Sequence, residues 1–372
     1  MLAIYRKYRP QKLANVLGQE SVTQILHGAA IQDRLAHAYL FYGPRGSGKT
    51  TTARIIAKIA NCLTRASDEG FRATGEPCNT CSSCKEIDEG RALDVVEIDA
   101  ASNRGIDEIR DLKENVKFAP SRLRCKIFII DEAHQLTKEA FNALLKTLEE
   151  PPAHAIFILA TTDFDRMPAT IVSRSQRFHF RRLPLKTIVE KLKEIARLEK
   201  IEADSDALEL IAVAAEGSLR DAESLLDQIT SLENKVTLES VESSLGRVGF
   251  RRTSEFAGLI LAKDLSKALD YLFKISEDGH NIVQFNKDLI QYFRRVLALQ
   301  VSPELEADYR LELADKELET LKKHSAAIDP RQTILFLKSL IRAQSEMRYS
   351  PFPHIPLEVA IIENLRAKTK TD

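Results

Sequence analysis

The feature that most constrains the fold is a glycine-rich octapeptide, GPRGSGKT, at residues 43–50. An apolar run, residues 38–42, precedes it, and a segment with helical spacing, residues 51–59, follows it. A strand, a glycine loop and a helix in this order predict a phosphate-binding loop, in which backbone N–H groups and the helix N-terminus surround the phosphates. The alternative is a glycine turn that binds nothing. We therefore expect the chain to bind a nucleoside triphosphate.

The residues of this loop have separate expected roles toward ATP and Mg²⁺. Lys49 is predicted to reach the β- and γ-phosphate oxygens, and Thr50 to offer its hydroxyl to Mg²⁺. The residues predicted to contact the nucleotide and its metal from this segment are Gly43, Pro44, Arg45, Gly46, Ser47, Gly48, Lys49, Thr50 and Thr51.

A second apolar run, residues 127–130, ends in two adjacent carboxylates, Asp131 and Glu132. A carboxylate at the end of a buried strand can hold Mg²⁺ or its water shell, which we assign to Asp131. The carboxylate beside it can polarise the attacking water, so Glu132 is the candidate general base. Taken alone, the pair would more often be two solvated acids at a strand end. Together with the phosphate-binding loop, it favours a Walker B strand.

The remaining pattern predicts an α/β domain with a parallel sheet, followed by helical domains. Residues 94–98 and 155–160 are continuous apolar runs, as expected for parallel strands buried on both faces. Between the predicted Walker B strand, residues 127–130, and the run that begins at residue 155, we expect a helix. It should begin after Thr137 and end before Pro151. From about Leu185 onward no strand is predicted, and apolar residues recur at helical spacing. One such face consists of Ile282, Phe285, Leu289, Phe293 and Val296.

Three polar positions are candidates for a chemical role. Thr162 follows the strand that ends at residue 160, where a side chain could contact the γ-phosphate or the attacking water, although a plain turn would have the same sequence. Arg174 precedes a short apolar pattern, and Arg220 lies at the start of a helix with a capping-box-like spacing. Either arginine alone would more often be a surface charge.

Four of the five cysteines form a pattern typical of a structural zinc site. Cys78, Cys81 and Cys84 are spaced CxxCxxC, and Cys62 precedes them. Disulfides are disfavoured in the cytoplasm, while four thiolates suit tetrahedral Zn²⁺ and leave no position for a catalytic water. The alternative is a set of free thiols. Cys125 is most simply a buried strand residue.

Composition limits location and partners. The chain has 54 basic and 54 acidic residues, so no global field attracts it to nucleic acid or membrane, and any DNA contact must be local. No apolar run approaches the length that a bilayer demands, and the N-terminus lacks the pattern of a signal peptide. We expect a soluble cytoplasmic protein of two or three domains with no membrane partner.

The order of these motifs resembles the AAA+ ATPases of the clamp-loader clade. Within this clade, the chain most resembles the tau/gamma family of bacterial DNA polymerase III subunits. The features that indicate this family are the four-cysteine insertion and three further stretches, residues 5–10, 141–152 and 215–221. Residues that match the family are frequent from about residue 3 to residue 246. Beyond residue 246 the resemblance consists only of a helical pattern. The motifs that carry it are GPRGSGKT, DEAH at 131–134, TTD at 161–163, SRS at 173–175 and GSLRD at 217–221.

The resemblance implies a domain division and further site residues. Residues 1–180 would be the AAA+ ATPase domain with a zinc module at about 62–84, residues 181–246 a three-helix lid, and residues 247–372 a helical collar for oligomerisation. Thr162 would be the first sensor, Arg220 would reach the γ-phosphate from the lid, and Arg174 would act in trans on the ATP of a neighbouring subunit. The adenine side would be lined by Tyr8, Arg9 and Pro10. One departure is Ser175, where the family usually has cysteine.

The resemblance also implies an activity and partners. The chain would be an ATP-hydrolysing motor subunit that opens the sliding clamp and loads it on primed DNA, within a hetero-oligomeric ring expected to be a pentamer with several copies of this chain. Ser102, Asn103 and Arg104 are candidate DNA contacts, although a helix cap explains them equally well. Longer family members continue into domains that bind the polymerase and the helicase, so those contacts are expected only with a C-terminal extension. The competing functions are another AAA+ motor, such as a helicase loader or branch-migration ATPase, and a nucleotide-binding scaffold without turnover.

Overall fold

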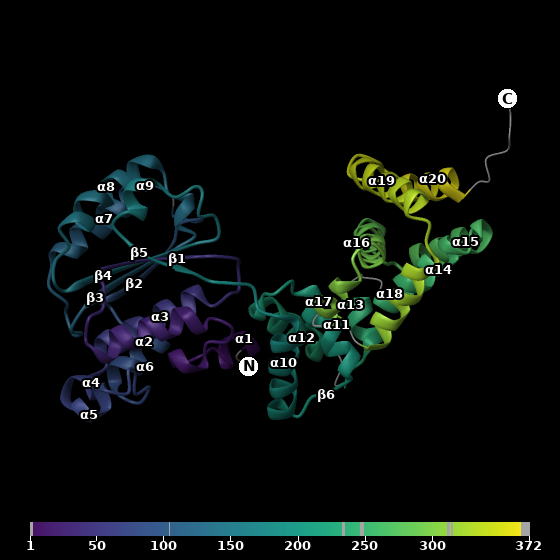
Figure 1. The fold of residues 1–372 in the computed structure, drawn as a ribbon. Coiled ribbons are helices and arrows are strands. Elements are labelled where there is room, and N and C mark those ends of the chain that lie inside the picture. The colour runs from purple at the N-terminus through teal and green to yellow at the C-terminus, as the bar shows by residue number, and fades with distance from the viewer. Residues whose placement is uncertain are drawn as a thin grey trace. The chain divides into compact units, whose positions relative to one another are not determined.

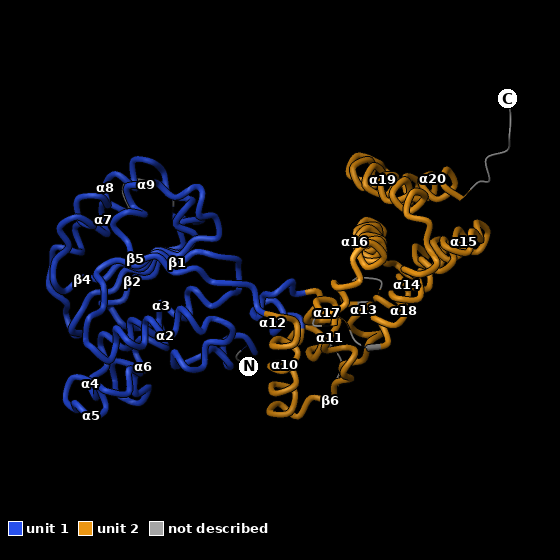
Figure 2. The backbone as a smooth tube through the Cα atoms, in the orientation of Figure 1, with its two compact units in different colours: residues 1–183, 215–225 blue, residues 184–214, 226–372 orange. Residues whose placement is uncertain are grey.

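The computed structural model describes residues 3–103, 105–232, 235–245, 249–310, 313 and 315–365. The chain forms two compact units, shown in different colours in Figure 2. The first contains residues 1–183 and 215–225, and the second contains residues 184–214 and 226–372. The division passes through one helix, α12 (Leu219–Leu232).

A five-stranded parallel sheet forms the centre of the first unit (Figure 1). Its strand order is β2-β3-β4-β1-β5, and every neighbouring pair is parallel. The predicted parallel sheet is therefore confirmed. The strands are β1 (Ala38–Tyr42), β2 (Val95–Asp99), β3 (Lys126–Asp131), β4 (Ala155–Thr161) and β5 (Gln176–His179).

Helices cover both faces of this sheet, which explains the continuous apolar sequences of β1, β3 and β4. The edge strand β2 is only partly buried, so the expectation of burial on both faces is wrong for residues 94–98. Successive side chains of a strand point to opposite faces. In β1, Tyr39 and Phe41 belong to one apolar cluster with residues of α2 and α3, whereas Ala38 and Leu40 belong to another with residues of α7 and α8. Figure 1 shows these two pairs of helices on opposite faces of the sheet. The helices of this unit are α1 (Ile4–Lys7), η1 (Leu13–Asn15), α2 (Glu20–Ile31), α3 (Lys49–Asn61), α4 (Leu63–Ser67), α5 (Glu69–Arg72), α6 (Ser82–Asp88), α7 (Ile106–Lys117), η2 (Ala133–Gln135), α8 (Lys138–Glu149) and α9 (Ala169–Val172).

Helix α8 begins and ends where its sequence predicts. The Thr137 hydroxyl accepts a hydrogen bond from the backbone N–H of Ala140 at 3.2 Å, so Thr137 is the N-cap. The helix ends at Glu149, two residues before Pro151, because the residue before a proline disfavours helical backbone.

The second unit is helical, with one small exception. Two-residue strands β6 (Glu202–Ala203) and β7 (Lys235–Val236) pair in parallel, so the expectation of no strand after Leu185 is wrong at this point. Strands of two residues are too short to show an apolar run, so the sequence pattern does not identify them. The helices are α10 (Leu185–Glu199), α11 (Ser205–Ala214), the end of α12, α13 (Leu238–Leu245), α14 (Phe250–Leu261), α15 (Leu265–Glu277), α16 (Ile282–Val301), η3 (Pro303–Leu305), α17 (Glu306–Tyr309), α18 (Asp315–Ala327), α19 (Pro330–Glu346) and α20 (His354–Leu365).

Helix α16 supplies the centre of the helical core. Its predicted apolar face is buried, and Phe285, Leu289 and Val296 are fully inaccessible. This face belongs to one apolar cluster that also includes residues of α14, α15, α18, α19 and α20. The 3.6-residue periodicity therefore identified the core of this region correctly.

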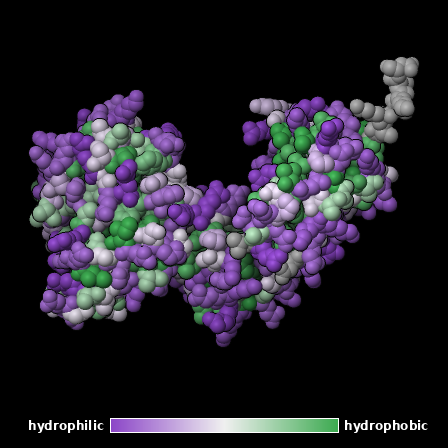
Figure 3. Space-filling view, viewed as in Figure 1, coloured by the Kyte–Doolittle hydropathy of each residue, from purple (hydrophilic) through white to green (hydrophobic). Residues whose placement is uncertain are grey.

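The face of the molecule shown in Figure 3 is mainly polar. Hydrophilic residues cover much of the face shown in Figure 3, with smaller hydrophobic areas between them. Among the described helices, none has the length and apolar character that a membrane span requires.

Candidate nucleotide and metal sites

The motif residues of the first unit meet at one edge of the sheet. The glycine-rich loop follows β1, Asp131 ends β3, and Thr161 ends β4. Because β4 pairs in parallel with both β1 and β3, their carboxyl ends lie side by side, with Tyr42 opposite Thr161 and Ile130 opposite Leu159. This edge is where ligands bind in open parallel sheets.

The loop at residues 43–50 requires its glycines. Gly43, Gly46 and Gly48 have φ values of +143°, +71° and +100°, which L-residues with side chains rarely adopt. A Cβ on Gly43 would lie 2.1 Å from the carbonyl oxygen of Phe180, and one on Gly46 would lie 1.8 Å from the Ser218 hydroxyl oxygen. The loop leads directly into α3, so backbone N–H groups and the helix N-terminus face one place.

Lys49 is a buried cation inside this loop. Lys49 is only 6% exposed, and its Nζ donates hydrogen bonds to the carbonyl oxygens of Gly43 and Pro44 at 2.8 Å each. Burial lowers the pKa of the ammonium, and the charges of Glu132 and Asp131 act in the opposite direction. Since its partners are neutral carbonyls, a phosphate oxygen would be a stronger acceptor for this group.

Thr50 and Asp131 come together as the sequence predicts. The Thr50 hydroxyl donates to Asp131 Oδ2 at 2.7 Å, although the two residues belong to α3 and β3. Asp131 Oδ1 accepts from the backbone N–H of Glu132 at 2.9 Å, which fixes the carboxylate. A hydroxyl and a carboxylate are oxygen ligands of the kind that Mg²⁺ prefers, so the residues fit a magnesium–nucleotide site.

Glu132 is held by Thr162. The Thr162 hydroxyl donates to Glu132 Oε2 at 2.7 Å, and His134 Nδ1 lies 3.5 Å from the same oxygen. The backbone of Glu132 is left-handed, with φ +47°, which is uncommon for a residue with a side chain. The candidate general base and the candidate sensor are therefore direct partners.

A cavity lies beside the loop within the first unit. Its lining includes the predicted site residues Arg9, Pro10, Asp131, Glu132 and Arg220, together with residues 45–51. Gly43, Pro44, Tyr8 and Thr162 do not belong to its lining. The lining residues that the sequence analysis missed are Tyr5, Val16, Leu17, Leu183, Leu219 and Glu223.

Tyr5 and Arg220 are partners in this cavity. The Arg220 guanidinium lies 5.0 Å from the centre of the Tyr5 ring, within cation–π range. Ser218 accepts a hydrogen bond from the N–H of Asp221 at 3.3 Å and so caps the helix that carries Arg220. The N-terminal motif contained the signal for Tyr5, because this residue lies in the same stretch as Arg9 and Pro10.

Gln19 is a further residue that sequence reasoning missed. It is 3% exposed, and its amide exchanges hydrogen bonds with the backbone of Arg181, at 2.8 and 3.0 Å. Its nitrogen also lies 3.4 Å from the carbonyl oxygen of Ser47. Gln19 thus ties the phosphate-binding loop to the segment after β5.

Arg174 lies outside the cavity lining. It follows α9, and its guanidinium pairs with Glu149 at the end of α8, with an Nη2–Oε1 distance of 2.5 Å. Its Nη1 also donates to the carbonyl of Thr170 at 2.9 Å. A role toward this chain's own cavity has no support from these contacts, and the predicted role in trans stays a prediction.

The candidate DNA segment is organised around Asp99. The Asp99 carboxylate accepts from the N–H of Ala101 at 2.9 Å and from the Ser102 hydroxyl at 3.2 Å, and Asn103 donates to the Asp99 carbonyl at 3.1 Å. These bonds give Ser102 and Asn103 a local role in the turn. Arg104 lies outside the described residues.

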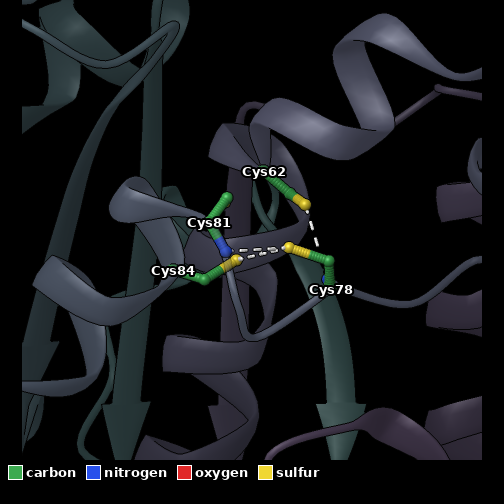
Figure 4. A group of neighbouring side chains, drawn as sticks. All are labelled: Cys62, Cys78, Cys81 and Cys84. Atoms are coloured by element: carbon green, nitrogen blue, oxygen red, sulfur yellow. Dashed lines mark hydrogen bonds between the residues drawn. The ribbon is translucent and has the colours of Figure 1, made fainter.

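The four predicted metal ligands form one cluster (Figure 4). The sulfur atoms of Cys62, Cys78, Cys81 and Cys84 all lie within 4.8 Å of one another. Cys62 and Cys84 are buried, and Cys125 is not part of the group. A compact set of four thiols fits a tetrahedral four-thiolate Zn²⁺ site.

The surroundings of the cluster favour the thiolate form of Cys78. Burial opposes ionisation of Cys78, but hydrogen bonds from Thr64, Thr80 and Cys81 outweigh it and lower its pKa to about 5. Burial raises the pKa values of the Cys62 and Cys84 thiols. A metal ion that binds here would have to displace the protons of these two buried thiols.

Replacing one cluster residue is expected to remove the metal. Cys84→Ser should purify with less than about a tenth of the zinc of the unchanged chain, because structural zinc binding is worth about 10 kcal/mol or more and depends on the full ligand set. Cys125→Ser is the matched control and should keep one zinc per chain. Atomic absorption on purified protein measures both, and full zinc retention by Cys84→Ser would contradict the site.

Three protein-family models match successive parts of the chain. DNA polymerase III delta subunit matches residues 18–184, the DNA polymerase III clamp loader subunit ATPase lid domain matches residues 187–232, and domain III of DNA polymerase III subunits gamma and tau matches residues 236–371. DNA polymerase III subunit tau of Bacillus subtilis is 43% identical over 364 residues, which are 97% of this chain and 62% of the relative. The chain belongs to the tau/gamma family of DNA polymerase III subunits.

A second tau subunit agrees with membership in the tau/gamma family. DNA polymerase III subunit tau of Escherichia coli is 38% identical over 361 residues, covering 97% of this chain and 54% of the relative. The chain thus spans between half and two thirds of the length of these two tau subunits. Among solved structures, the Bacillus subtilis DNA clamp loader delta protein aligns with a TM-score of 0.40 and 13% identity, over 92% of this chain and 99% of that one.

Proposed function

We propose that this chain is an ATP-hydrolysing motor subunit of the DNA polymerase III clamp loader. ATP binding would open the sliding clamp, and hydrolysis on primed DNA would release it. The observation that carries the proposal is the meeting of Lys49, Thr50, Asp131 and Glu132 at one sheet edge in a member of the tau/gamma family.

Each residue at this edge has a proposed task. Lys49 would exchange its carbonyl acceptors for β- and γ-phosphate oxygens, and the N-terminus of α3 would stabilise the same charge. Thr50 and Asp131 would hold Mg²⁺, which neutralises charge on the phosphates when bound. Glu132 would accept a proton from the attacking water, with Thr162 positioning its carboxylate. Arg220 would leave the Tyr5 ring for the γ-phosphate.

Hydrolysis is proposed to need a neighbouring subunit. Arg174 would act on the neighbour's ATP, and in the single chain its guanidinium is instead neutralised by Glu149. An arginine supplied in trans makes turnover depend on closure of the ring. The ring would contain other clamp-loader subunits and several copies of this chain, as a pentamer.

The other parts of the chain would support this motor. Residues 181–246 would act as the lid and residues 247–372 as the collar that holds subunits together. The four cysteines would hold a structural Zn²⁺, and Ser102, Asn103 and Arg104 would approach the backbone of primed DNA. The proposal places the protein in the bacterial cytoplasm. Polymerase and helicase contacts belong to it only if the chain has a C-terminal extension.

Substitution of the loop lysine tests the nucleotide site. Lys49→Ala is expected to weaken binding of Mg–ATP by about 100-fold, because the variant loses a charge-assisted contact of roughly 1.5–3 kcal/mol and the attraction of a buried cation. Equilibrium binding of a fluorescent ATP analogue measures the change. Lys138→Ala, at the exposed start of α8, is the control and should bind normally. Normal binding by Lys49→Ala would place the nucleotide elsewhere.

A further inference from the structure

A buried carboxylate joins the cysteine module, residues 62–84, to the N-terminal segment, residues 9–17. Glu76 is only 8% exposed, and its two oxygens accept from the backbone N–H groups of Leu13 and Ala14 at 2.9 Å each. These N–H groups lie in the first turn of η1, where no intrahelical acceptor is available. Hydrogen bonds to an ionised carboxylate are about twice as strong as neutral ones. The module therefore fixes a helix outside itself.

A buried lysine makes a second connection between the same two parts. Lys58 in the last turn of α3 is 1% exposed, and its Nζ donates to Asn79 Oδ1 at 2.7 Å. Asn79 lies between two of the clustered cysteines, Cys78 and Cys81. The same Nζ donates to the side-chain oxygen of Gln11 and lies 3.3 Å from its carbonyl oxygen. The charge is balanced by Asp88 at 2.9 Å.

The segment held in this way is part of the wall of the nucleotide cavity. Arg9 and Pro10 line the cavity, and so do Val16 and Leu17. The contacts from Lys58 and Glu76 reach residues 11, 13 and 14, between these two pairs of lining residues. The middle of this wall segment is thus held at residue 11 through Lys58 and at residues 13 and 14 by Glu76 of the module.

We propose that the cysteine module positions this wall, so that metal binding and nucleotide binding are coupled, with Glu76 as the positioning residue that links them. The cluster orders the chain around Cys78, which sets the place of both Glu76 and Asn79. If the metal stabilises the wall for the nucleotide, the nucleotide stabilises the metal by the same factor, because coupling free energies are reciprocal. The inference rests on the proposed nucleotide site but not on hydrolysis.

The first arm of the test changes the link and leaves the cysteines intact. In the full chain, Glu76→Gln should keep one zinc yet bind a fluorescent ADP analogue about tenfold more weakly, because the amide accepts one N–H but presents its NH₂ to the other. Glu69→Gln, the same change at an exposed position of the module, should bind normally. Unchanged affinity in zinc-loaded Glu76→Gln overturns the proposal.

The second arm removes the metal. A chelator should weaken analogue binding by the unchanged chain about tenfold and by Glu76→Gln much less, since its link is already lost. An equal loss in both proteins would mean that metal and carboxylate act independently, which overturns the coupling. If Glu76→Gln loses zinc or does not fold, Gln11→Ala replaces it, because this variant removes a Lys58 acceptor outside the module. Normal binding by Gln11→Ala then overturns the proposal.

These outcomes differ from a failure of the proposed function. A chain that binds no analogue, with zinc or without it, contradicts the nucleotide site and this inference together. A chain that binds but never hydrolyses contradicts the motor alone and leaves the coupling measurable.

Discussion

Glu132→Gln is expected to bind ATP with near-normal affinity and to lose turnover by about 10²- to 10⁴-fold, the usual contribution of a positioned general base. Glutamine has nearly the same shape, and its amide oxygen can still accept the 2.7 Å hydrogen bond from the Thr162 hydroxyl. The substitution therefore removes proton affinity and leaves the position of the side chain. The binding constant of the isolated chain and the single-turnover rate of the assembled ring with Mg–ATP measure the two effects separately.

A matched variant separates chemistry from stability in this experiment. Glu139→Gln makes the same change on the exposed first turn of α8 and should turn over ATP like the unchanged chain. Retained turnover in Glu132→Gln would remove this carboxylate from the role of base. Loss of binding would instead show that it holds the nucleotide.

Arg174→Ala is expected to abolish stimulated turnover in the assembled ring, with a loss of about 10³-fold or more, the range of an arginine supplied in trans. Binding of ATP to the isolated chain should not change, because Arg174 does not line its own chain's cavity and pairs with Glu149. The comparison of isolated-chain binding with assembled-ring turnover is therefore the diagnostic measurement.

The control for this second experiment is another exposed arginine. Arg122 precedes β3, so it lies at the amino edge of the sheet, and Arg122→Ala should leave stimulated turnover intact. Weaker ATP binding by the isolated Arg174→Ala chain would place the arginine in cis. Full turnover by the assembled variant would exclude it from the reaction.

The fold of the first unit could be predicted because its signals are local. Buried parallel strands have continuous apolar sequences, and the glycine loop, Thr137 and Pro151 mark where elements begin and end. The order of the strands at the sheet edge then brings Thr50 to Asp131 and Glu132 to Thr162. These pairings follow from topology once the strands are known.

The contacts that the sequence did not reveal depend on distant packing. Tyr5 lies in the predicted N-terminal stretch, but its partnership with Arg220 joins residues more than two hundred positions apart. Glu76 and Gln19 have no motif, since a lone acid or amide in a polar loop has the same sequence whether it is solvated or buried. The β6–β7 pair likewise joins segments that are distant in the sequence and too short to show an apolar run.

The most direct test of the proposed motor is ATP turnover by this chain mixed with the other clamp-loader subunits, with and without the sliding clamp and primed DNA. A clamp-loader motor should be strongly stimulated by clamp and primed DNA together, and the Arg174→Ala assembly should lose that stimulation. Turnover that is indifferent to the clamp would contradict a clamp-loader function and favour another AAA+ motor. The absence of turnover under every condition would leave a nucleotide-binding scaffold.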